Sequence, residues 1–473
     1  MPLTIEDITI FCKKKGFVYQ DSEIYGSLAG FWDFGPLGIE LKNNIKNNWW
    51  KYFIHNNEEI VGIDGSIITH PRIWEASGHT RSFIDIAAKC PKCGYKTKLD
   101  KDELKKAKCP KCGSAYKEQG KFNIMFTTNV GPVEQESIKA YLRPETAQVI
   151  FADLKLVQEN ARLKLPFGIG QIGKVFRNEI SPRDFLYRSR EFEQMELQYF
   201  IDPKKADDCP HYEKIKNYKI KVLVAGTKKE TPLSLAQLLK KKIIKNKWHA
   251  YWLYNSYQWF LHLGINKNDL RLREHRKDEL SHYAKAAIDI EYNFPAGWKE
   301  IFGSHDRGQF DLTEHEKHSK KDMKLYDEET KQKILPQVIE SSFGVDRTFL
   351  IVLFNAYQDD KKRGNIVLNL NPGLAPVKIA VLPLVSNKPQ IIKFAKKVLD
   401  DLKKHYNCAY DQSGSIGRRY ARNDEIGTPF CITIDFDSLK KKDVTIRDRN
   451  TTKQIRVKIK DLPATIYKLL YKK

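Results

Sequence analysis

The stretch from Lys174 to Phe200 constrains the fold of this chain more than any other, because it reads as two strands joined by a charged loop. Strand alternation places Arg177 and Glu179 on one face of the first strand. Phe192 and Glu196 share a face of the returning strand in the same way. A phosphate-binding cation, an aromatic ring and a carboxylate for an amine are the groups that hold ATP beside an amino acid. Any one of these arginines alone would more often be a solvated surface charge.

Two further stretches supply side chains of the same kinds. Tyr141–Gln148 carries Glu145 directly after a proline, in a segment with extended backbone preference. Glu340–Arg347 reads as a strand, a glycine and then a helix, with Arg347 in the first helical turn. An arginine beside a helix N-terminus helps to bind phosphate. Either stretch alone is weak support, but both extend the set of groups on the hairpin.

Four of the eight cysteines form two C-x2-C pairs that are separated by 15 residues. This spacing is typical of two knuckles that close one tetrahedral thiolate site around zinc. Free thiols or a redox site are the alternative, but two Pro-Lys-Cys-Gly knuckles favour zinc. With four protein ligands the site is closed and therefore structural. The predicted ligands are Cys90, Cys93, Cys109 and Cys112.

The order of patterns along the chain predicts several units. Apolar residues at four-residue intervals predict a helix over 37–54, followed by a strand over 60–69 that stops at Pro71. Turn formers at 371–376 precede alternating strand and helix patterns. The expected domains are 1–370, with a lysine-rich zinc-ribbon insertion at 88–121 and a mainly helical insertion at 203–290, and a separate α/β domain at 375–473.

The composition shows a large positive net charge, and a polyanionic partner is one explanation of it. The 473 residues are too many for one core. The 82 Lys and Arg residues against 59 Asp and Glu residues leave a net charge of +23, which fits nucleic acid or simple solubility about equally well. The first residues lack the build of a signal peptide, and apolar runs such as 349–354 are too short to cross a bilayer. We expect a cytoplasmic protein with no membrane association.

Together, FRNE with the later FEQME, RPETAQ and ESSFGVDR resemble the signature blocks of class II aminoacyl-tRNA synthetases, and specifically of glycyl-tRNA synthetases of the homodimeric archaeal and eukaryotic-like type. The helix, strand and Pro71 series resembles the dimer-forming first motif of that class, and Gly414–Phe430 resembles the family's anticodon-binding domain. The resemblance covers nearly the whole chain except the two insertions. It implies an α+β fold: a catalytic domain on an antiparallel sheet, with insertions, followed by an α/β anticodon-binding domain.

The resemblance also implies roles for individual residues. For ATP, Arg177 would meet the α-phosphate, Arg188 and Arg347 the γ-phosphate end, Glu179 and Phe192 the adenine, and Glu300 a magnesium ion. The implied ATP-binding set is Arg177, Asn178, Glu179, Arg188, Phe192, Glu300, Ile301 and Arg347, with Arg177 and Arg347 as the catalytic pair. The implied glycine-binding set is Glu145, Glu196, Arg307, Glu340 and Ser342, with Arg307 at the carboxylate.

The implied reaction activates glycine with ATP and Mg²⁺ and then transfers glycine to the 3′ end of tRNA(Gly), releasing AMP and diphosphate. The implied anticodon residues are Arg418, Arg419, Tyr420 and Arg422. Docking of the C-terminal domain on the catalytic domain explains those arginines equally well. One departure from the family pattern is Asp346, where a glycine often stands.

Two other functions fit parts of the pattern. One is a binding protein that kept the fold and the RNA surface but lost catalysis, which the complete set of arginines and carboxylates disfavours. The other is a synthetase for proline or threonine, which the RPETAQ and ESS carboxylates disfavour.

Overall fold

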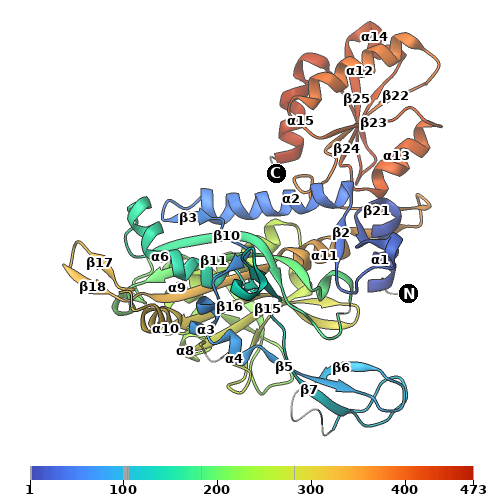
Figure 1. Ribbon diagram of the computed structural model, residues 1–473. Coiled ribbons are helices and arrows are strands. Elements are labelled where there is room, and N and C mark those ends of the chain that lie inside the picture. The colour runs from blue at the N-terminus through green and yellow to red at the C-terminus, as the bar shows by residue number, and fades with distance from the viewer. Residues whose placement is uncertain (1–2, 100–103, 105, 183, 282, 472–473) are drawn as a thin grey trace.

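A nine-stranded sheet forms the body of the protein, with a ribbon projecting from it and a C-terminal domain standing apart (Figure 1). The computed structural model describes residues 3–99, 104, 106–182, 184–281 and 283–471. Within the described part of the chain, no helix combines the length and the apolar character that a membrane span requires.

The main sheet is antiparallel except where β10 pairs with β3 and where β12 pairs with β14. Its strand order is β13-β12-β14-β15-β16-β19-β11-β10-β3, so neighbours come from distant parts of the sequence. This confirms the predicted antiparallel α+β architecture. The strands are β3 (Ile60–Ile63), β10 (Phe167–Phe176), β11 (Glu191–Ile201), β12 (Lys219–Leu223), β13 (Thr231–Ser234), β14 (Leu270–Glu274), β15 (Ala286–Phe294), β16 (Gly297–Gly308) and β19 (Gln337–Gly344).

The two faces of the sheet have different chemistry, and strand alternation separates them. Met195 and Leu197 of β11 point into the main apolar core, where α9 (Lys247–His262) and α11 (Val345–Ala356) also pack. Phe192, Glu196 and Phe200 of the same strand lie on the opposite face. There Phe200 joins a second core with α6 (Ala147–Ala161) and α10 (Phe310–Ser319), whereas the polar residues are left to form a site.

The first motif differs slightly from its predicted form. The predicted helix is α2 (Pro36–Trp50), which continues as one π-helical turn to His55. The predicted strand at 60–69 divides into β3 and the short β4 (Ile68–Thr69). Pro71 does more than end the strand, because it begins α3 (Pro71–Ala76). Proline suits the first helical position, where no intrahelical partner for its missing N–H is needed.

The segment 203–290 contains more strand than its predicted, mainly helical character implies. It holds α7 (Tyr212–Ile215), α8 (Leu235–Lys240) and the long α9, but it also supplies β12, β13 and β14 to the main sheet. These strands are four or five residues long, and β12 and β14 alternate basic with apolar residues. Such short alternating runs become strands through pairing with the sheet rather than through their own propensity.

Smaller elements surround the sheet. The projecting ribbon is a three-stranded sheet of β5 (Ile84–Lys89), β6 (Lys96–Leu99) and β7 (Lys117–Asn123), within the predicted insertion at 88–121 and its stem. Residues 100–103 and 105 of that insertion lie outside the described residues. The others are α1 (Ile5–Lys15), β1 (Val18–Gln20), β2 (Trp32–Phe34), α4 (His79–Ser82), β8 (Thr127–Val130), β9 (Ile138–Leu142), β17 (Leu325–Asp327), β18 (Gln332–Ile334), β20 (Tyr357–Asp360) and β21 (Asn365–Leu368).

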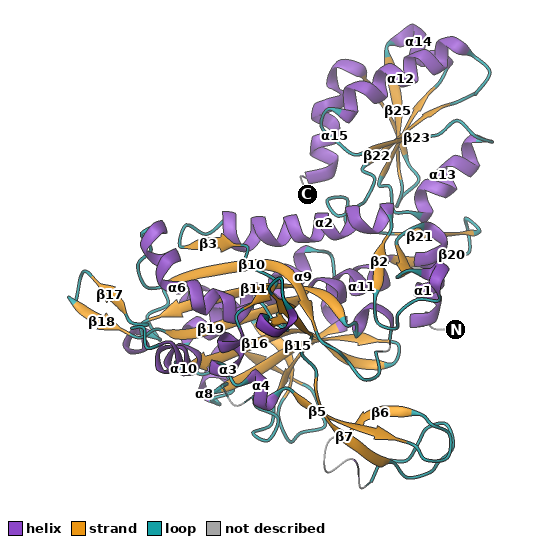
Figure 2. Cartoon of the chain, viewed as in Figure 1, coloured by secondary structure: helices purple, strands orange, loops and turns teal. Residues whose placement is uncertain are grey.

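The C-terminal domain is α/β, with helices flanking a five-stranded sheet of order β23-β22-β24-β25-β26 (Figure 2). Its own apolar core separates it from the body. The strands are β22 (Ile379–Pro383), β23 (Cys408–Tyr410), β24 (Phe430–Ile434), β25 (Asp443–Asp448) and β26 (Gln454–Lys458), and the helices are α12 (Pro389–Lys403), α13 (Ile416–Glu425), α14 (Phe436–Lys441) and α15 (Leu462–Tyr471).

Buried polar contacts dock this domain on the body. Arg363, in the β20–β21 turn, reaches the carboxylate of Asp424 at 3.3 Å and the carbonyl oxygen of Arg449 at 2.7 Å. Arg449 in turn donates to the carbonyl of Leu370 at 2.6 Å. Glu425 pairs with Lys15 of α1. The acidic end of α13 is therefore the docking surface.

Candidate active site

A cavity of about 630 Å³ opens on the polar face of the sheet, over β11, β16 and β19. It brings together most of the predicted site residues from distant segments of the chain. Among the residues that line it are Glu145, Arg177, Glu179, Arg188, Phe192, Glu196, Glu300, Ile301, Glu340, Ser342 and Arg347. Asn178 is not among them, and its backbone N–H donates to the carbonyl of Ile124 at 2.7 Å.

Arg177 lies between two aromatic rings at one side of the cavity. Its guanidinium carbon is 5.5 Å from the centre of the Phe192 ring and 5.4 Å from that of Phe83. Its Nε donates to the carbonyl of Pro144 at 2.9 Å. These contacts fix the cation in place, which is the arrangement that favours binding of a phosphate by a preorganised charge.

A second cation, Arg347, stands at the start of α11. Its Nη1 donates to Glu300 Oε1 at 2.9 Å, and its guanidinium packs 4.7 Å from the centre of the Tyr187 ring. Arg188 and Glu179 form a third charged contact on the cavity wall, with Nε of Arg188 3.1 Å from Glu179 Oε2. The phosphate-binding and adenine-binding residues predicted from the sequence thus lie in one cavity.

Asp346, the departure from the family pattern, leaves the backbone path regular. It lies in the first turn of α11, after Gly344 in an ordinary extended conformation. Its carboxylate accepts from the backbone N–H of Glu193 at 2.7 Å and from Lys42 Nζ at 3.2 Å. Lys42 belongs to α2 and also reaches the Glu193 carboxylate at 2.7 Å. Asp346 therefore ties the helix of the first motif to the floor of the site.

Arg143 anchors the turn that presents Glu145. Its Nε donates to the carbonyl of Lys174 at 2.8 Å and its Nη1 to that of Gly65 at 2.6 Å. The guanidinium lies so close to β10 that a Cβ on Gly173 would stand 2.0 Å from Nη2. Only glycine allows this approach, so the arginine and the glycine together set the position of the turn.

Three buried carboxylates also line the cavity. Glu196 accepts from Thr146 Oγ1 at 2.5 Å and from Ser342 Oγ at 2.8 Å. Glu145 lies 3.2 Å from His79 Nε2 and accepts from Gln148 at 3.0 Å. Glu340 Oε2 lies 2.7 Å from His305 Nδ1. Burial opposes ionisation of Glu145, but His79 and Arg307 hold its pKa below the ordinary value.

Arg307, for which the resemblance implies a contact with the glycine carboxylate, lies next to Glu340 and is not among the residues that line the cavity. Its side chain is 1% exposed. It donates to Glu340 Oε1 at 2.8 Å and, through two nitrogens, to both oxygens of Asp311 at 2.8 Å. The ring of Tyr283 covers it at 3.7 Å. Three N–H groups of its guanidinium are used in these bonds, so Arg307 holds the carboxylate cluster, and its contact with the glycine carboxylate stays a prediction.

Among the residues that contact the predicted ones but belong to no predicted set are His79, Phe83, Tyr283 and His305. His79 and Phe83 lie in the stem of the lysine-rich insertion, where no motif marks them. His305 lies two residues before the predicted Arg307, and on β16 it stands directly opposite the predicted Glu340 of β19. Knowledge of that strand pairing would have identified it. Tyr283 is in a loop without a pattern.

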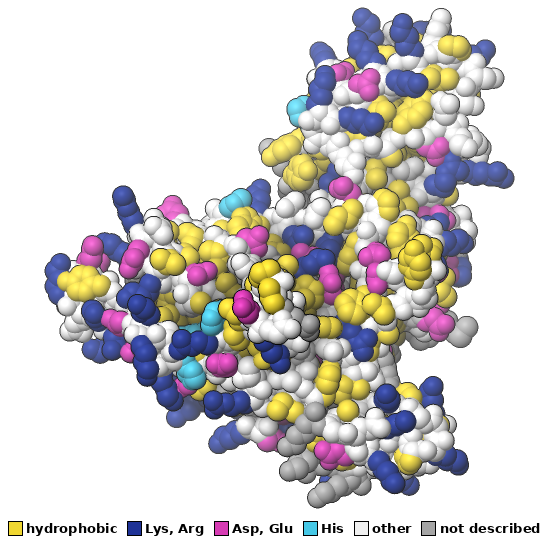
Figure 3. Space-filling model, in the orientation of Figure 1, with side chains coloured by type: hydrophobic (Ala, Val, Ile, Leu, Met, Phe, Trp, Pro, Cys, Tyr) yellow, Lys and Arg dark blue, Asp and Glu magenta, His cyan; other side chains and the backbone are white. Residues whose placement is uncertain are grey.

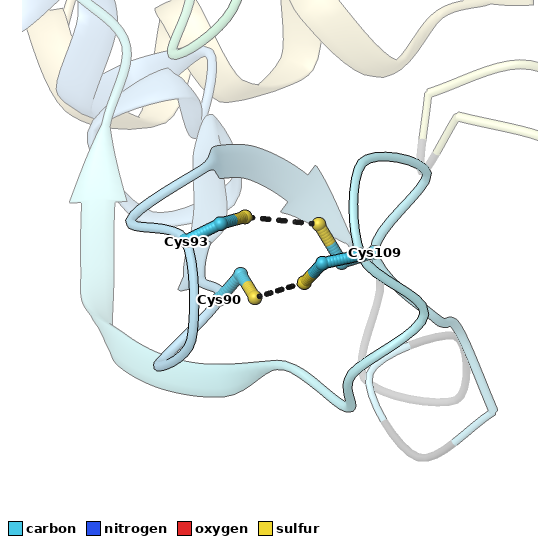
Figure 4. A group of neighbouring side chains, drawn as sticks. Cys90, Cys93 and Cys109 are labelled. Atoms are coloured by element: carbon cyan, nitrogen blue, oxygen red, sulfur yellow. Dashed lines mark hydrogen bonds between the residues drawn. The ribbon is translucent and has the colours of Figure 1, made fainter.

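The four predicted zinc ligands form one cluster, in which all four sulfur atoms lie within 4.8 Å of one another (Figure 4). Each close pair joins one knuckle to the other: Cys90 Sγ lies 3.3 Å from that of Cys112, and Cys93 Sγ lies 3.5 Å from that of Cys109. Four thiols around one centre are the donor set that a tetrahedral zinc site uses. The cluster therefore has the composition and compactness needed for a metal.

The four predicted anticodon residues have different environments on α13. Arg418 and Arg422 are exposed, and Arg422 Nε donates to Asp411 at 3.0 Å. Tyr420 bonds Thr433 at 2.6 Å. Arg419 is 1% exposed and bonds carbonyl oxygens, including that of Gly414 at 3.0 Å. Arg419 is thus not available to RNA, because its charge is used to hold the turn before α13. None of the four makes the docking contacts described above.

Fold and site together define a class II aminoacyl-tRNA synthetase. Residues 378–469 match the family model of an anticodon binding domain. A prolyl-tRNA synthetase from Cryptosporidium parvum has a similar fold, with a TM-score of 0.61, 14% identity, and coverage of 98% of this chain and 75% of its own. At that identity only the fold is shared.

The sequence relatives are more specific. The glycine–tRNA ligase of Acetivibrio thermocellus is 44% identical over 97% of this chain and 97% of its own length. That of Borrelia hermsii is 43% identical over 97% of this chain and 96% of its own. The chain belongs to the glycine–tRNA ligase family. It is an ATP-dependent ligase that activates glycine and attaches it to tRNA, which confirms the predicted function over the two alternatives.

Phe83 provides a test of this geometry, because it contacts Arg177 from outside all the motifs. A cation–π contact at a partly exposed site contributes about 0.5–1 kcal/mol. Phe83→Ala should therefore raise the KM for ATP about two- to fivefold in ATP–pyrophosphate exchange and leave the KM for glycine unchanged. Phe436→Ala, at an exposed phenylalanine of the C-terminal domain, serves as the control. An unchanged KM for ATP in Phe83→Ala would contradict the assignment of Arg177 to phosphate.

Proposed function

We propose that the two sides of the cavity divide the substrates of the first reaction step. Arg177, Arg188 and Arg347 bind the phosphates of ATP, and Phe192 and Glu179 bind its adenine. The carboxylates Glu145, Glu196 and Glu340, with Ser342, bind the ammonium group of glycine. The observation that carries this division is that fixed cations and a cluster of three buried carboxylates line one cavity, each group held by its own partners.

The chemistry then needs positioning and charge rather than proton transfer. The carboxylate of glycine attacks the α-phosphate in line, diphosphate leaves, and the 3′-terminal adenosine of tRNA takes the glycyl group from the adenylate. Arg177 and Arg347 stabilise the charge that develops on the phosphates. Mg²⁺ bound with ATP would supply further charge neutralisation there, and Glu300 is the carboxylate that we assign to it. We assign no general base.

The crowding of the glycine side explains selection of the smallest amino acid. Three carboxylates within one buried cluster leave no room for a side chain on the bound substrate. Pockets that must reject a smaller substrate discriminate only about 10- to 200-fold per methylene, whereas rejection of larger substrates is steric. No editing site is therefore needed.

The C-terminal domain and the basic surface serve tRNA in this proposal. Figure 3 shows lysine and arginine side chains over the projecting ribbon and over the C-terminal domain. With a net charge of +23, binding of tRNA should weaken steeply as salt rises. Of the predicted anticodon residues we retain exposed Arg418 and Arg422, with Tyr420 beside them. Binding of tRNA at a series of salt concentrations tests this assignment when Arg418→Ala and Arg422→Ala are compared with the unaltered protein.

We also propose a structural zinc at the four cysteines and a homodimer built on the first motif. The edge position of β3 in the main sheet supports the dimer, since an unpaired edge is a site for pairing. Exposed Ile68, Val130 and Ile138 on the neighbouring β4-β9-β8 sheet add apolar area. A tRNA substrate and unpaired cysteines fit the cytoplasm as the location.

Replacement of Arg177 tests the phosphate assignment. Arg177→Ala should abolish glycine-dependent ATP–pyrophosphate exchange because the α-phosphate loses its fixed cation. Affinity for tRNA, measured by filter binding, should stay nearly intact. Glu300→Gln should instead raise the Mg²⁺ concentration that gives half-maximal exchange. Comparable loss of exchange and of tRNA affinity in Arg177→Ala would mean that the site is misplaced.

Native mass spectrometry tests zinc and dimer in one experiment. The expected species contains two chains of 55.0 kDa and about one zinc ion per chain. Cys109→Ser should lose the zinc, whereas Cys408→Ser, at a cysteine outside the cluster, should keep it. Detection of a metal-free protein would mean that the four cysteines are free thiols. Detection of single chains alone would contradict the proposed homodimer.

A further inference from the structure

The three carboxylates that we assign to glycine are buried together, and few cations lie close to them. Glu145, Glu196 and Glu340 are 7%, 2% and 3% exposed. Burial of a carboxylate disfavours its charged form, and a neighbouring carboxylate disfavours it further. Which of the three can remain ionised without substrate therefore depends on the partners of each.

Glu145 and Glu340 each have cationic partners. Glu340 receives a hydrogen bond from Arg307 at 2.8 Å and lies 2.7 Å from His305. Glu145 lies 3.2 Å from His79 and 4.0 Å from Arg307. Burial works against the charge of Glu340, but Arg307 and His305 hold its pKa below the ordinary value.

Glu196 differs from the other two, because its hydrogen-bond partners are hydroxyl groups. Thr146 bonds one of its oxygens and Ser342 bonds the other. Among the described residues, no lysine, arginine or histidine nitrogen lies within 4.0 Å of its carboxylate. A hydroxyl can accept as well as donate, so these two partners, unlike a cation, can still bond Glu196 when it carries a proton.

The charged groups that face Glu196 from neighbouring elements are hydrogen-bonded to other partners, although Arg143 also interacts with Glu196 through its charge. Arg307 donates through two nitrogens to Asp311 of α10 and through the third to Glu340. Its positive charge is therefore shared between these two acids. Arg143 is the next arginine, and it donates to the carbonyls of Lys174 and Gly65. His79 and His305 contact Glu145 and Glu340. Gln171, opposite Glu196 on β10, is neutral.

We infer that Glu196 is protonated in the free enzyme and gives up its proton when the ammonium group of glycine binds beside it. The inference rests on the glycine site proposed above. The proton passes from the Glu196 carboxyl to the solvent, and the ammonium group, which keeps its own protons, becomes the cation that Glu196 otherwise lacks. Burial together with the charges of Glu340 and Glu145 raises the pKa of Glu196 to about 8.

The direction of the pH dependence follows from this exchange. Below the raised pKa of Glu196, binding of the ammonium must displace a proton, so affinity for glycine rises about tenfold per pH unit. Near and above that pKa the carboxylate is already ionised, and affinity levels off until the amine of the ligand itself loses its proton. Ligands without an ammonium group should displace no proton at any pH.

Calorimetry with two matched ligands tests the inference on the full-length protein. The ligands are 5′-O-(N-glycylsulfamoyl)adenosine and the acetyl analogue, which differs only by lacking the amine. Each is titrated at pH 7.0 in phosphate and in Tris, whose different ionisation enthalpies report the protons released. We expect roughly 0.8 proton released per site for the glycyl ligand and none for the acetyl ligand, after allowing for the partial ionisation of the ligand's own amine.

Two variants separate the possible outcomes. Glu196→Gln should release no proton and bind the glycyl ligand more weakly, whereas Glu191→Gln, on the same strand outside the cluster, should retain full release. Weaker binding in Glu196→Gln with no proton release by the unaltered protein would overturn the inference and leave the glycine site standing. Equal affinity and equal release in Glu196→Gln and the unaltered protein would overturn both.

Discussion

The carboxylate cluster that we assign to glycine depends on Arg307, a buried arginine that neutralises several buried acids. It joins Asp311 of α10 to Glu340 of β19 and lies near Glu145. A buried cation with fewer partners would be costly, and so would these carboxylates without it. The ion-pair cluster thus stabilises a concentration of negative charge that no isolated carboxylate could keep in the protein interior. In our proposal that charge makes the pocket selective for an ammonium group.

Tertiary packing then brings the cations that we assign to the phosphates into the same cavity as this cluster. Arg177 follows β10, whereas Arg347 lies far along the chain in α11. An aromatic ring packs against each of the two guanidinium groups. Phe83 adds a contact from the stem of the cysteine-bearing ribbon, and Ser181 of the hairpin loop donates to the carbonyl of Lys96 in that ribbon at 2.9 Å. The ribbon is therefore in contact with the loop and the cation that we assign to ATP, and the proposed zinc would support both.

Local sequence reasoning predicted the groups whose chemistry lies in one strand or turn. Alternation on the hairpin gave the shared face of Phe192 and Glu196, and cysteine spacing gave the metal cluster. Contacts between distant segments could not be predicted from these local patterns. The sequence shows that Arg307 and Arg419 are present but not which buried acceptors surround them. Arg307 bonds Asp311 and Glu340, and Arg419 bonds the carbonyl oxygens of a turn.

A crystal structure of the protein with 5′-O-(N-glycylsulfamoyl)adenosine tests the central claim most directly. We predict that the ammonium nitrogen lies within hydrogen-bonding distance, about 2.7–3.2 Å, of Glu196 and of at least one of Glu145 and Glu340. The adenine should stack on Phe192, and the sulfamoyl group should meet Arg177. An ammonium group directed away from the three carboxylates, or an adenine bound outside the Phe192 side of the cavity, would contradict the account.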